Sequence, residues 1–185
     1  MSNSYAQPIL RTADAGEALC TVARLLEVAD TSELEVDYEA VVSSASALTR
    51  LLKLLPCADW WAEGGRGGSS QDGVDPVACL PVRVRSWGHC ADVVVPLVRA
   101  SGSEPAAVRW DFAGWPVAPE VGLGVGGSRG AFVTLCLNAR DLDLEHPAAD
   151  HTVFVHVKQV EGARAPWLAA RVGQRVIGEL VMAPY

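Results

Sequence analysis

Three histidines lie among acidic residues late in the chain, and together they could hold a metal ion, because imidazoles and carboxylates are common metal ligands. His146, His151 and His156 recur every five residues. Their acidic neighbours are Asp141, Asp143, Glu145 and Asp150. His151 and His156, however, lie an odd number of residues apart on a predicted strand and so face opposite sides. We therefore expect a solvated acidic loop and no metal site, although the sequence leaves open whether these histidines bind a metal.

Two further patterns suggest catalysis but lack the neighbours that catalysis needs. Cys90 beside His89 could form a nucleophile pair, yet nothing in the sequence places an oxyanion hole near it. The segment 122–127, GLGVGG, matches a dinucleotide-binding pattern, but a predicted strand follows it where a phosphate site needs the start of a helix. We expect a strand followed by a glycine-rich hairpin turn over 126–130. The sequence thus predicts no catalytic residue and no cofactor, and a protein that is not an enzyme.

Tryptophans are the more informative residues, because tryptophan is enriched at the centres of protein interfaces. Trp60 and Trp61 are adjacent and precede a glycine-rich segment. They could cap a helical core, or they could anchor a partner or a membrane interface. Four tryptophans are candidate interaction residues: Trp60, Trp61, Trp115 and Trp167.

The composition limits the classes of function that the chain can serve. Half of its 185 residues are hydrophobic and 20% are charged, which is enough apolar content for one folded domain. The net charge is −7. Nucleic-acid binding, which needs a basic surface, is therefore not expected. Contact with an anionic membrane would be peripheral at most.

The start of the chain and the cysteines indicate where the protein resides. The first residues lack a basic leader followed by an apolar run, so we expect no signal peptide. No run of 18 apolar residues predicts a transmembrane segment. Five scattered cysteines without CxxC spacing are typical of reduced thiols. We expect a cytoplasmic or otherwise intracellular protein.

The first third of the chain has helical spacing of its apolar residues. After a loose leader over 1–11, Asp14 can cap a helix over 14–29. A second apolar stripe predicts a helix from about residue 31 to Leu55, where Pro56 ends it. Two helices with so short a joint predict an antiparallel helical hairpin. Its apolar stripes need covering by the rest of the chain or by another protein.

The remainder of the chain has the sequence pattern of short strands. Glycines and polar residues over 64–76 form a linker or a loop that separates a helical hairpin region, 1–63, from a second domain, 77–185. About seven β-branched runs follow at roughly 10–15-residue spacing. The runs lie at 80–87, 91–100, 106–112, 120–125, 131–139, 151–160 and 165–183. The expected fold is α+β, with the hairpin followed by a jelly-roll-like antiparallel β-sandwich.

One stretch resembles a known family. The segment 108–125, VRWDFAGWPVAPEVGLGV, is similar to the strands of the GOLD domain, which read hydrophobic-x-Trp-x-Phe and then, after an acidic residue, a strand such as VGFGI. The matching residues are Val108, Trp110, Phe112, Glu120, Val121, Gly122, Leu123, Gly124 and Val125. The stretch 165–184 is similar to the closing strands of that family. The resemblance spans about residues 80–184.

The resemblance implies a β-sandwich that binds other proteins and does not catalyse a reaction. Within that family, the chain is similar to the version of the domain that is attached to lipid-transfer proteins in the cytosol. We therefore expect a non-catalytic adaptor whose partners are other proteins. An alternative is a structural subunit of a larger multiprotein assembly, which would dock through the helical hairpin and Trp60 with Trp61.

Overall fold

The computed structural model of the chain describes residues 4–62, 67–69, 75–127 and 130–183. A nine-stranded sheet in which all neighbours are antiparallel runs through the molecule, in the order β11-β1-β10-β9-β6-β2-β5-β3-β4. Its strands are β1 (Ser4–Thr12), β2 (Glu35–Val42), β3 (Asp59–Ala62), β4 (Gly67–Ser69), β5 (Val82–His89), β6 (Ala106–Asp111), β9 (Phe132–Leu137), β10 (His151–Lys158) and β11 (Val181–Met182). The expected mixture of helices with a large antiparallel sheet is confirmed.

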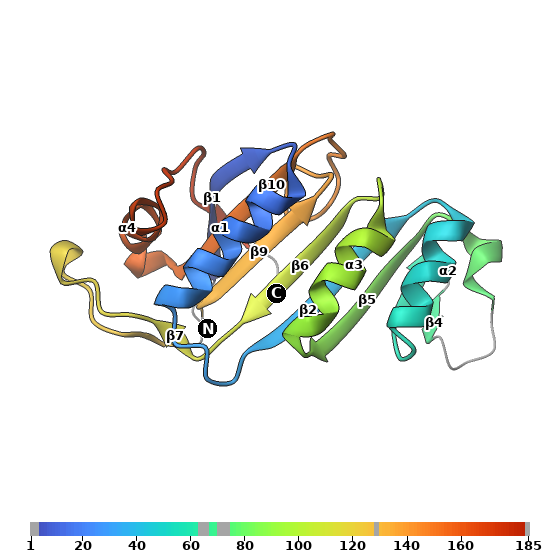
Figure 1. Cartoon of the computed structure of the whole chain (residues 1–185), viewed down its shortest axis with the longest axis horizontal. Coiled ribbons are helices and arrows are strands. Elements are labelled where there is room, and N and C mark those ends of the chain that lie inside the picture. Colours follow the sequence, from blue (N-terminus) through green and yellow to red (C-terminus); the bar gives the residue numbers. More distant parts are fainter. Residues whose placement is uncertain (1–3, 63–66, 70–74, 128–129, 184–185) are drawn as a thin grey trace.

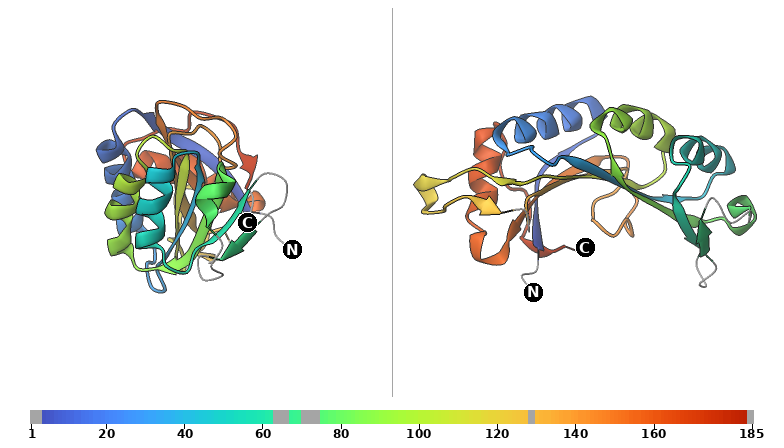
Figure 2. Two further views of the ribbon diagram at one scale, coloured as in Figure 1. Left: turned by 90° about the vertical axis from the view of Figure 1, so that its right-hand side faces the viewer. Right: turned by 90° about the horizontal axis from the view of Figure 1, so that it is seen from below.

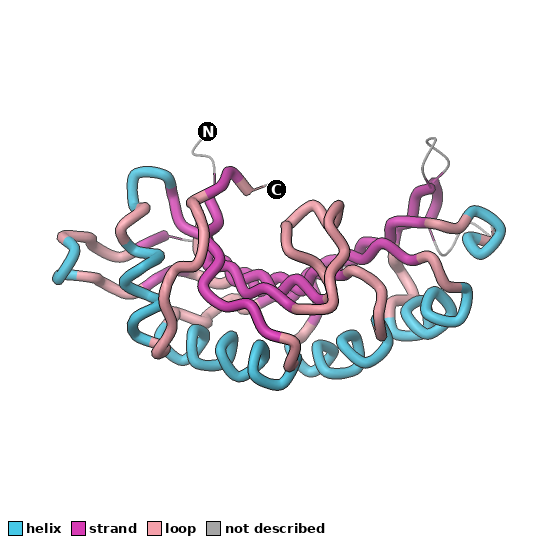
Figure 3. The backbone as a smooth tube through the Cα atoms, turned by 90° about the horizontal axis from the view of Figure 1, so that it is seen from above, coloured by secondary structure: helices cyan, strands magenta, loops and turns pink. Residues whose placement is uncertain are grey.

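Three helices lie in a row on one face of this sheet (Figure 1). They are α1 (Ala15–Val28), α3 (Val94–Ser101) and α2 (Ala45–Leu54). A fourth helix, α4 (Arg164–Arg171), stands at one end of the molecule (Figure 2). Both ends of the sheet curve away from the row of helices, so the opposite face is concave (Figure 3). Among the described residues, no helix is long and apolar enough to cross a membrane.

The strands separate apolar from polar residues because successive side chains point to opposite faces. On β2, four alternate residues are buried beneath the helices: Val36, Tyr38, Ala40 and Val42. Asp37 and Glu39, between them, face the concave side. Antiparallel sheets commonly pack one face and leave the other solvated, and this sheet follows that rule over its central strands.

A loop between β9 and β10, residues 138–150, folds over part of the concave face. Leu144 is buried and Leu142 half-buried, and both pack with Cys136 of β9 and Phe154 of β10 in a small second apolar cluster. In Figure 3 this loop stands on the side opposite to the helices. The concave face is thus partly walled by its own chain.

An arm projects from the end of the molecule that carries α4. It comprises residues 113–127 and begins and ends in a short ladder, β7 (Gly114–Trp115) with β8 (Gly126–Gly127). A Cβ atom on Gly114 would lie 2.3 Å from the carbonyl oxygen of Gly126, so the close approach of the two strands requires glycine there.

The predicted helical hairpin is wrong in its second half. The first helix is present as α1, and Asp14 caps it by accepting a hydrogen bond from the Gly16 amide at 2.8 Å. The stretch from Glu35 to Val42, however, is the strand β2, and only Ala45–Leu54 is helical, with Ser44 as its cap. Apolar residues in this stretch fit both periods, and burial at every second residue decides for the strand.

The predicted sandwich is not confirmed, because the structure has one large sheet with helices on one face. Two expected strands are helical instead. Residues Val94–Ser101 form α3 and Arg164–Arg171 form α4, and each helix has a proline in its first turn, where a missing amide costs nothing. The supposed leader contains β1, which pairs along its length with β10.

The sheet also joins segments that the sequence analysis assigned to different domains. Strands β1, β2 and β3, from the first 63 residues, pair with β10, β5 and β6, which lie beyond residue 77. Much of the expected linker, 64–66 and 70–74, lies outside the described residues. Its central part forms β4, at one edge of the sheet.

Candidate interaction surface

The concave face carries a row of charged residues that the strand register aligns. Asp37 on β2 lies opposite Arg109 on β6, and Glu39 on β2 lies opposite Arg85 on β5. Neighbouring strands bring directly opposite side chains within contact distance. The central strand therefore contributes the carboxylates, and its two neighbours contribute the guanidinium groups.

Glu39 is the centre of the first group in this row. One of its oxygens accepts a hydrogen bond from Nε of Arg85 at 2.7 Å, and Arg83 forms an ion pair with the other oxygen. Arg83 also donates to the carbonyl oxygen of Asp143 at 2.8 Å, which connects the 138–150 loop to the sheet. One carboxylate thus orders two arginines, and one of these holds the loop.

Asp37 is the centre of the second group. It accepts a hydrogen bond from Nη2 of Arg109 at 2.7 Å, and Arg109 also contacts Asp111 at 3.2 Å and lies 5.2 Å from the centre of the Phe132 ring. Burial raises the pKa of Asp111 to about 6 and outweighs the opposing effect of Arg109. The nearby charge of Asp37 acts in the same direction as burial.

Two tryptophans stack against Arg85 at the β5 end of the row. The guanidinium carbon lies 5.5 Å from the ring centre of Trp61 on β3 and 5.8 Å from that of Trp87 on β5. Trp87 is 51% exposed, which is unusual for so large an apolar side chain. Such cation–π contacts hold the arginine and both rings in a fixed arrangement.

A buried histidine closes the row at the other end. His156 on β10 is paired through Nε2 with Oγ1 of Thr134 at 2.9 Å. Burial lowers the pKa of His156 to about 3, and the positive charge of Arg109 acts in the same direction. The imidazole is therefore neutral at neutral pH.

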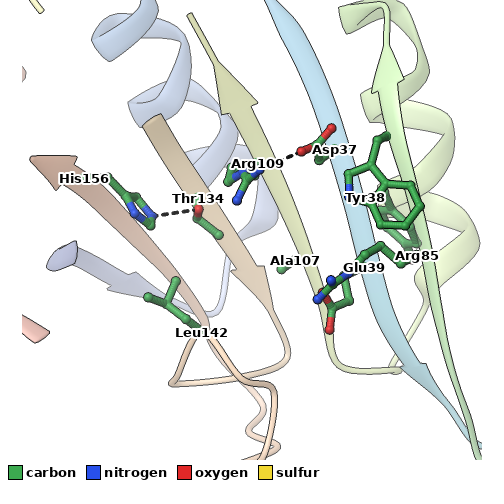
Figure 4. Close-up of a pocket in the computed structure, with 10 residues that line it drawn as sticks. Asp37, Tyr38, Glu39, Arg85, Ala107, Arg109, Thr134, Leu142 and His156 are labelled. Carbon is green, nitrogen blue, oxygen red and sulfur yellow. Dashed lines mark hydrogen bonds and ion pairs between the residues drawn. The ribbon is translucent and has the colours of Figure 1, made fainter. Parts of the chain in front are cut away.

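Between these groups the face is hollowed, as the close-up in Figure 4 shows. The hollow measures about 130 Å³. Arg85 and Arg109 lie on one side of it, Leu142 and His156 lie on the other, and the small side chain of Ala107 leaves the space between them open. The hollow is large enough for one side chain of a partner.

The structure brings one of the four predicted interaction tryptophans to this face. Trp61 is half-buried beside Arg85. Trp60 and Trp115 are only 2% and 1% exposed, so they pack the core and present no surface to a partner. Trp167 lies half-buried on α4, away from the row, and donates to Glu120 at 3.0 Å.

The three histidines of the acidic segment are not brought together. The exposed His146 pairs with Asp141 at 2.7 Å, and Nδ1 of His151 accepts the Asn138 amide at 3.1 Å. His156 lies beneath the hollow with Thr134. Within the described part of the chain, no group of three or more His, Cys, Asp or Glu side chains is placed to hold a metal ion.

The other two patterns with a possible chemistry also have structural surroundings. His89 is hydrogen-bonded to Ser86 at 2.8 Å, and the neighbouring Cys90 is exposed. The GLGVGG segment lies in the arm, and the strand β9 follows it, as expected. The strand expected over 120–125 is wrong, because Pro119–Val121 form a short 3-10 helix and Gly126–Gly127 form β8. Residues 128–129 of the expected turn lie outside the described residues.

The charged row was not predicted from the sequence, although its signal is present there. In β2 and β5, charged residues alternate with buried ones: Val36, Asp37, Tyr38 and Glu39 in the former, and Val82, Arg83, Val84 and Arg85 in the latter. Assigning 31–55 to a helix hid the first of these patterns. The pairing of β2 with β5 and β6 is a long-range feature that one sequence does not contain.

Comparison of the chain with protein-family models, with curated proteins and with solved structures finds no match. The resemblance to GOLD domains stays a prediction. Function must therefore be argued from the concave face itself.

Proposed function

We propose that the protein is a non-catalytic interaction module that binds another protein on the concave face of its sheet. The observation that supports this most is the stack of Trp61, Arg85 and Trp87 beside an open hollow. Tryptophan and arginine dominate the energetic centres of protein interfaces. On this face they are grouped, and the row of helices packs on the opposite side.

The surface is also ordered before any partner arrives. Glu39 fixes Arg83 and Arg85, Asp37 fixes Arg109, and aromatic rings cover both Arg85 and Arg109. A side chain that is already held loses less conformational entropy on binding. Such a surface binds a partner more tightly than a flexible surface of equal area.

The state of the ionisable groups supports binding over catalysis. Glu39 and Asp37 are each held in ion pairs with arginines. His156, the histidine nearest the hollow, has its pKa lowered to about 3, far from the value that suits a general base at neutral pH.

Affinity capture from an extract of the source cells tests the proposal. We compare the wild type with Trp87→Ala and, as a matched control, with Trp167→Ala, which removes a tryptophan far from the face. We expect Trp87→Ala to lose a protein that the wild type and Trp167→Ala both retain. Equal capture by all three proteins would show that Trp87 takes no part in docking.

A second variant separates the hollow from the stack. Ala107→Phe fills the hollow and removes no ion pair, so its fold should be intact by circular dichroism. Loss of the same captured protein would place the partner in the hollow. Unchanged capture by both Ala107→Phe and Trp87→Ala would contradict the proposed surface.

The alternative, a structural subunit of a larger assembly, is favoured by a different observation. The arm exposes several valines: Val117, Val121 and Val125 are 51%, 37% and 70% exposed. Apolar side chains gathered on a projecting segment are typical of surfaces covered in an assembly. The expected docking through a helical hairpin with Trp60 no longer applies, so the arm takes that place. Light scattering after size-exclusion chromatography tests this alternative, and a stable monomer would count against an obligate subunit.

A further inference from the structure

We infer that the partner bound on the concave face is a basic protein, one of whose arginine or lysine side chains lies over the exposed ring of Trp87. This inference rests on the proposed function and specifies the chemistry of the partner. Three features carry it: the balance of charges on the face, the stack that Trp87 terminates, and the position of Asp59 beside that stack.

On the concave face, more carboxylates than cations lack an ion-pair partner. Five cations on the concave strands and the 138–150 loop have an ion-pair partner: Arg83, Arg85, Arg109, Arg140 and Lys158. Arg11 of β1, which lies opposite Thr152, is exposed and forms no ion pair with any described residue. Four carboxylates of the same surface form no ion pair with any described residue: Glu35, Asp59, Asp143 and Glu145. The unpaired charge is therefore negative, and a positively charged partner complements it.

Trp87 offers a place for a cation. Arg85 contacts its ring at 5.8 Å from the centre, yet half of the side chain remains in solvent. A further guanidinium or ammonium group over the exposed ring would extend the series in which Trp61, Arg85 and Trp87 already alternate. Arginine suits this position better than lysine because its planar group stacks on aromatic rings.

Asp59 adds an unpaired carboxylate next to this place. It lies directly opposite Arg85 in the pairing of β3 with β5, so Trp87, two residues farther along β5, is its diagonal neighbour. Diagonal neighbours on one face are within reach of long side chains. A cation over Trp87 would therefore gain both the ring and a carboxylate that Arg85 does not neutralise.

An acidic partner is disfavoured by the same features. The whole chain carries a net charge of −7, and the free carboxylates of this face would repel further negative charge. The two arginines beside the hollow, Arg85 and Arg109, are already engaged by Glu39 and Asp37.

A titration followed through the indole N–H resonances tests the inference at the level of single tryptophans. The probes are a tetra-arginine peptide and a tetra-glutamate peptide. We expect the arginine peptide to shift the Trp87 resonance and to leave those of the buried Trp60 and Trp115 in place. We expect the glutamate peptide to shift none of them. A shift of Trp87 by the glutamate peptide, or no shift by the arginine peptide, would overturn the inference.

Two matched variants sharpen this titration. Asp59→Asn removes the carboxylate beside Trp87, and Glu27→Gln removes an exposed carboxylate from α1, on the other side of the sheet. Each changes the net charge by the same amount. We expect Asp59→Asn to weaken arginine-peptide binding about threefold and Glu27→Gln to leave it unchanged. Equal weakening by both would mean that only net charge attracts the peptide, and would overturn the inference.

The inference and the proposed function fail in different experiments. If Trp87→Ala loses a captured protein while the arginine peptide leaves the Trp87 resonance in place, the face binds a protein of other chemistry and the inference falls alone. If Trp87→Ala and Ala107→Phe both retain every captured protein, the proposed function falls as well. A captured protein that is basic and dissociates on raising the salt from about 0.05 M to about 0.5 M supports both.

Discussion

The indole N–H of Trp115 donates to the backbone carbonyl oxygen of His156 at 2.8 Å. This bond joins the base of the arm to the strand whose side chain closes one end of the charged row. The two structures with possible roles in binding, the arm and the concave face, therefore share β10. A change at either residue should affect the other.

Trp115→Phe keeps a large ring and removes the N–H group, which also donates to the carbonyl of Gly130 at 3.2 Å. Because two buried carbonyl oxygens lose their donor, we expect the free energy of unfolding to fall by about 1–3 kcal/mol. Urea denaturation measures this loss. Trp167→Phe, on the half-buried Trp167, is the control and should cost less than about 1 kcal/mol. Equal losses of unfolding free energy in Trp115→Phe and Trp167→Phe would show that the hydrogen bonds of the Trp115 N–H group do not stabilise the fold.

Arg164→Met should be among the most destabilising substitutions in the chain. Arg164 is 1% exposed, and it donates to the Pro116 and Gly124 carbonyl oxygens of the arm and to Glu161. Removing it leaves the two carbonyl oxygens without this donor, and leaves the Glu161 charge with Lys158, at 3.8 Å, in place of two cations. We expect a loss of about 3–5 kcal/mol in thermal or urea unfolding.

The control for Arg164 is Arg171→Met, also on α4. Arg171 pairs with Glu120 at 2.8 Å, but both side chains are about half exposed. Exposed ion pairs contribute less than about 1 kcal/mol. If Arg171→Met lowers the free energy of unfolding as much as Arg164→Met, burial is not the reason that Arg164 stabilises the fold.

His156 should make the fold sensitive to acid. Its pKa is lowered from 6.5 to about 3. Between these pH values the His156 imidazole is protonated in the unfolded chain and neutral in the folded protein. Stability should therefore fall as the pH drops from 6.5 toward 3, by up to about 1.4 kcal/mol per pH unit. His156→Gln should flatten this dependence in urea unfolding at several pH values. A flat profile in the wild type would disprove the prediction.

The helix α1 could be predicted from the sequence because its signals are local. Asp14 begins the helix, and apolar residues at helical spacing keep one side buried. The strand texture after residue 77 was also recognisable for β5, β6, β9 and β10. In each of these segments the spacing of the apolar residues fits either the helical period or the strand period, and not both.

The remaining elements could not be assigned with the same rules. Apolar residues of β2 fit a helical and a strand period together, and the pairing with β5 and β6 selects the strand. In α3 the run VVPLV is short and β-branched, which is typical of a strand, yet packing beside α2 makes it helical. The candidate surface depends on these long-range pairings, and for that reason its residues escaped prediction.

Asp111 should give a pH dependence of opposite sign to that of His156. Its pKa is raised from 3.8 to about 6, so the folded protein holds the proton more tightly than the unfolded chain. Ionisation of Asp111 should therefore lower stability as the pH rises from 3.8 to 6, with no further change above that range. Asp111→Asn should be more stable than the wild type at pH 7. The gain should be about 1 kcal/mol, since the side chain is 30% exposed and Arg109 offsets part of the cost.

Urea unfolding of Asp111→Asn and the wild type across this range measures the difference. Asp37→Asn is the comparison, since Asp37 pairs with the same arginine. A wild type that is more stable than Asp111→Asn at every pH would mean that the ion pair outweighs burial, and would refute this prediction.

The adjacent Trp60 and Trp61 should contribute very different amounts to stability. Trp60 is buried beneath the helices, and its N–H group has no hydrogen-bond partner among the described residues. Trp60→Ala should therefore cost about 3–5 kcal/mol of stability through the cavity it leaves, whereas Trp60→Phe relieves the unpaired N–H and should cost much less. Trp61→Ala should cost less than about 1 kcal/mol, because the half-buried ring contributes one contact with Arg85.

Binding should reverse that order. Trp61→Ala frees one side of Arg85 and so loosens the ordered stack on the concave face, while Trp60→Phe leaves this face intact. We expect partner capture to weaken in Trp61→Ala and to persist in Trp60→Phe. Measuring unfolding and capture on the same preparations separates the two roles. A Trp61→Ala protein that is stable and captures the partner as the wild type does would remove Trp61 from the interaction surface and leave Trp87 as its aromatic anchor.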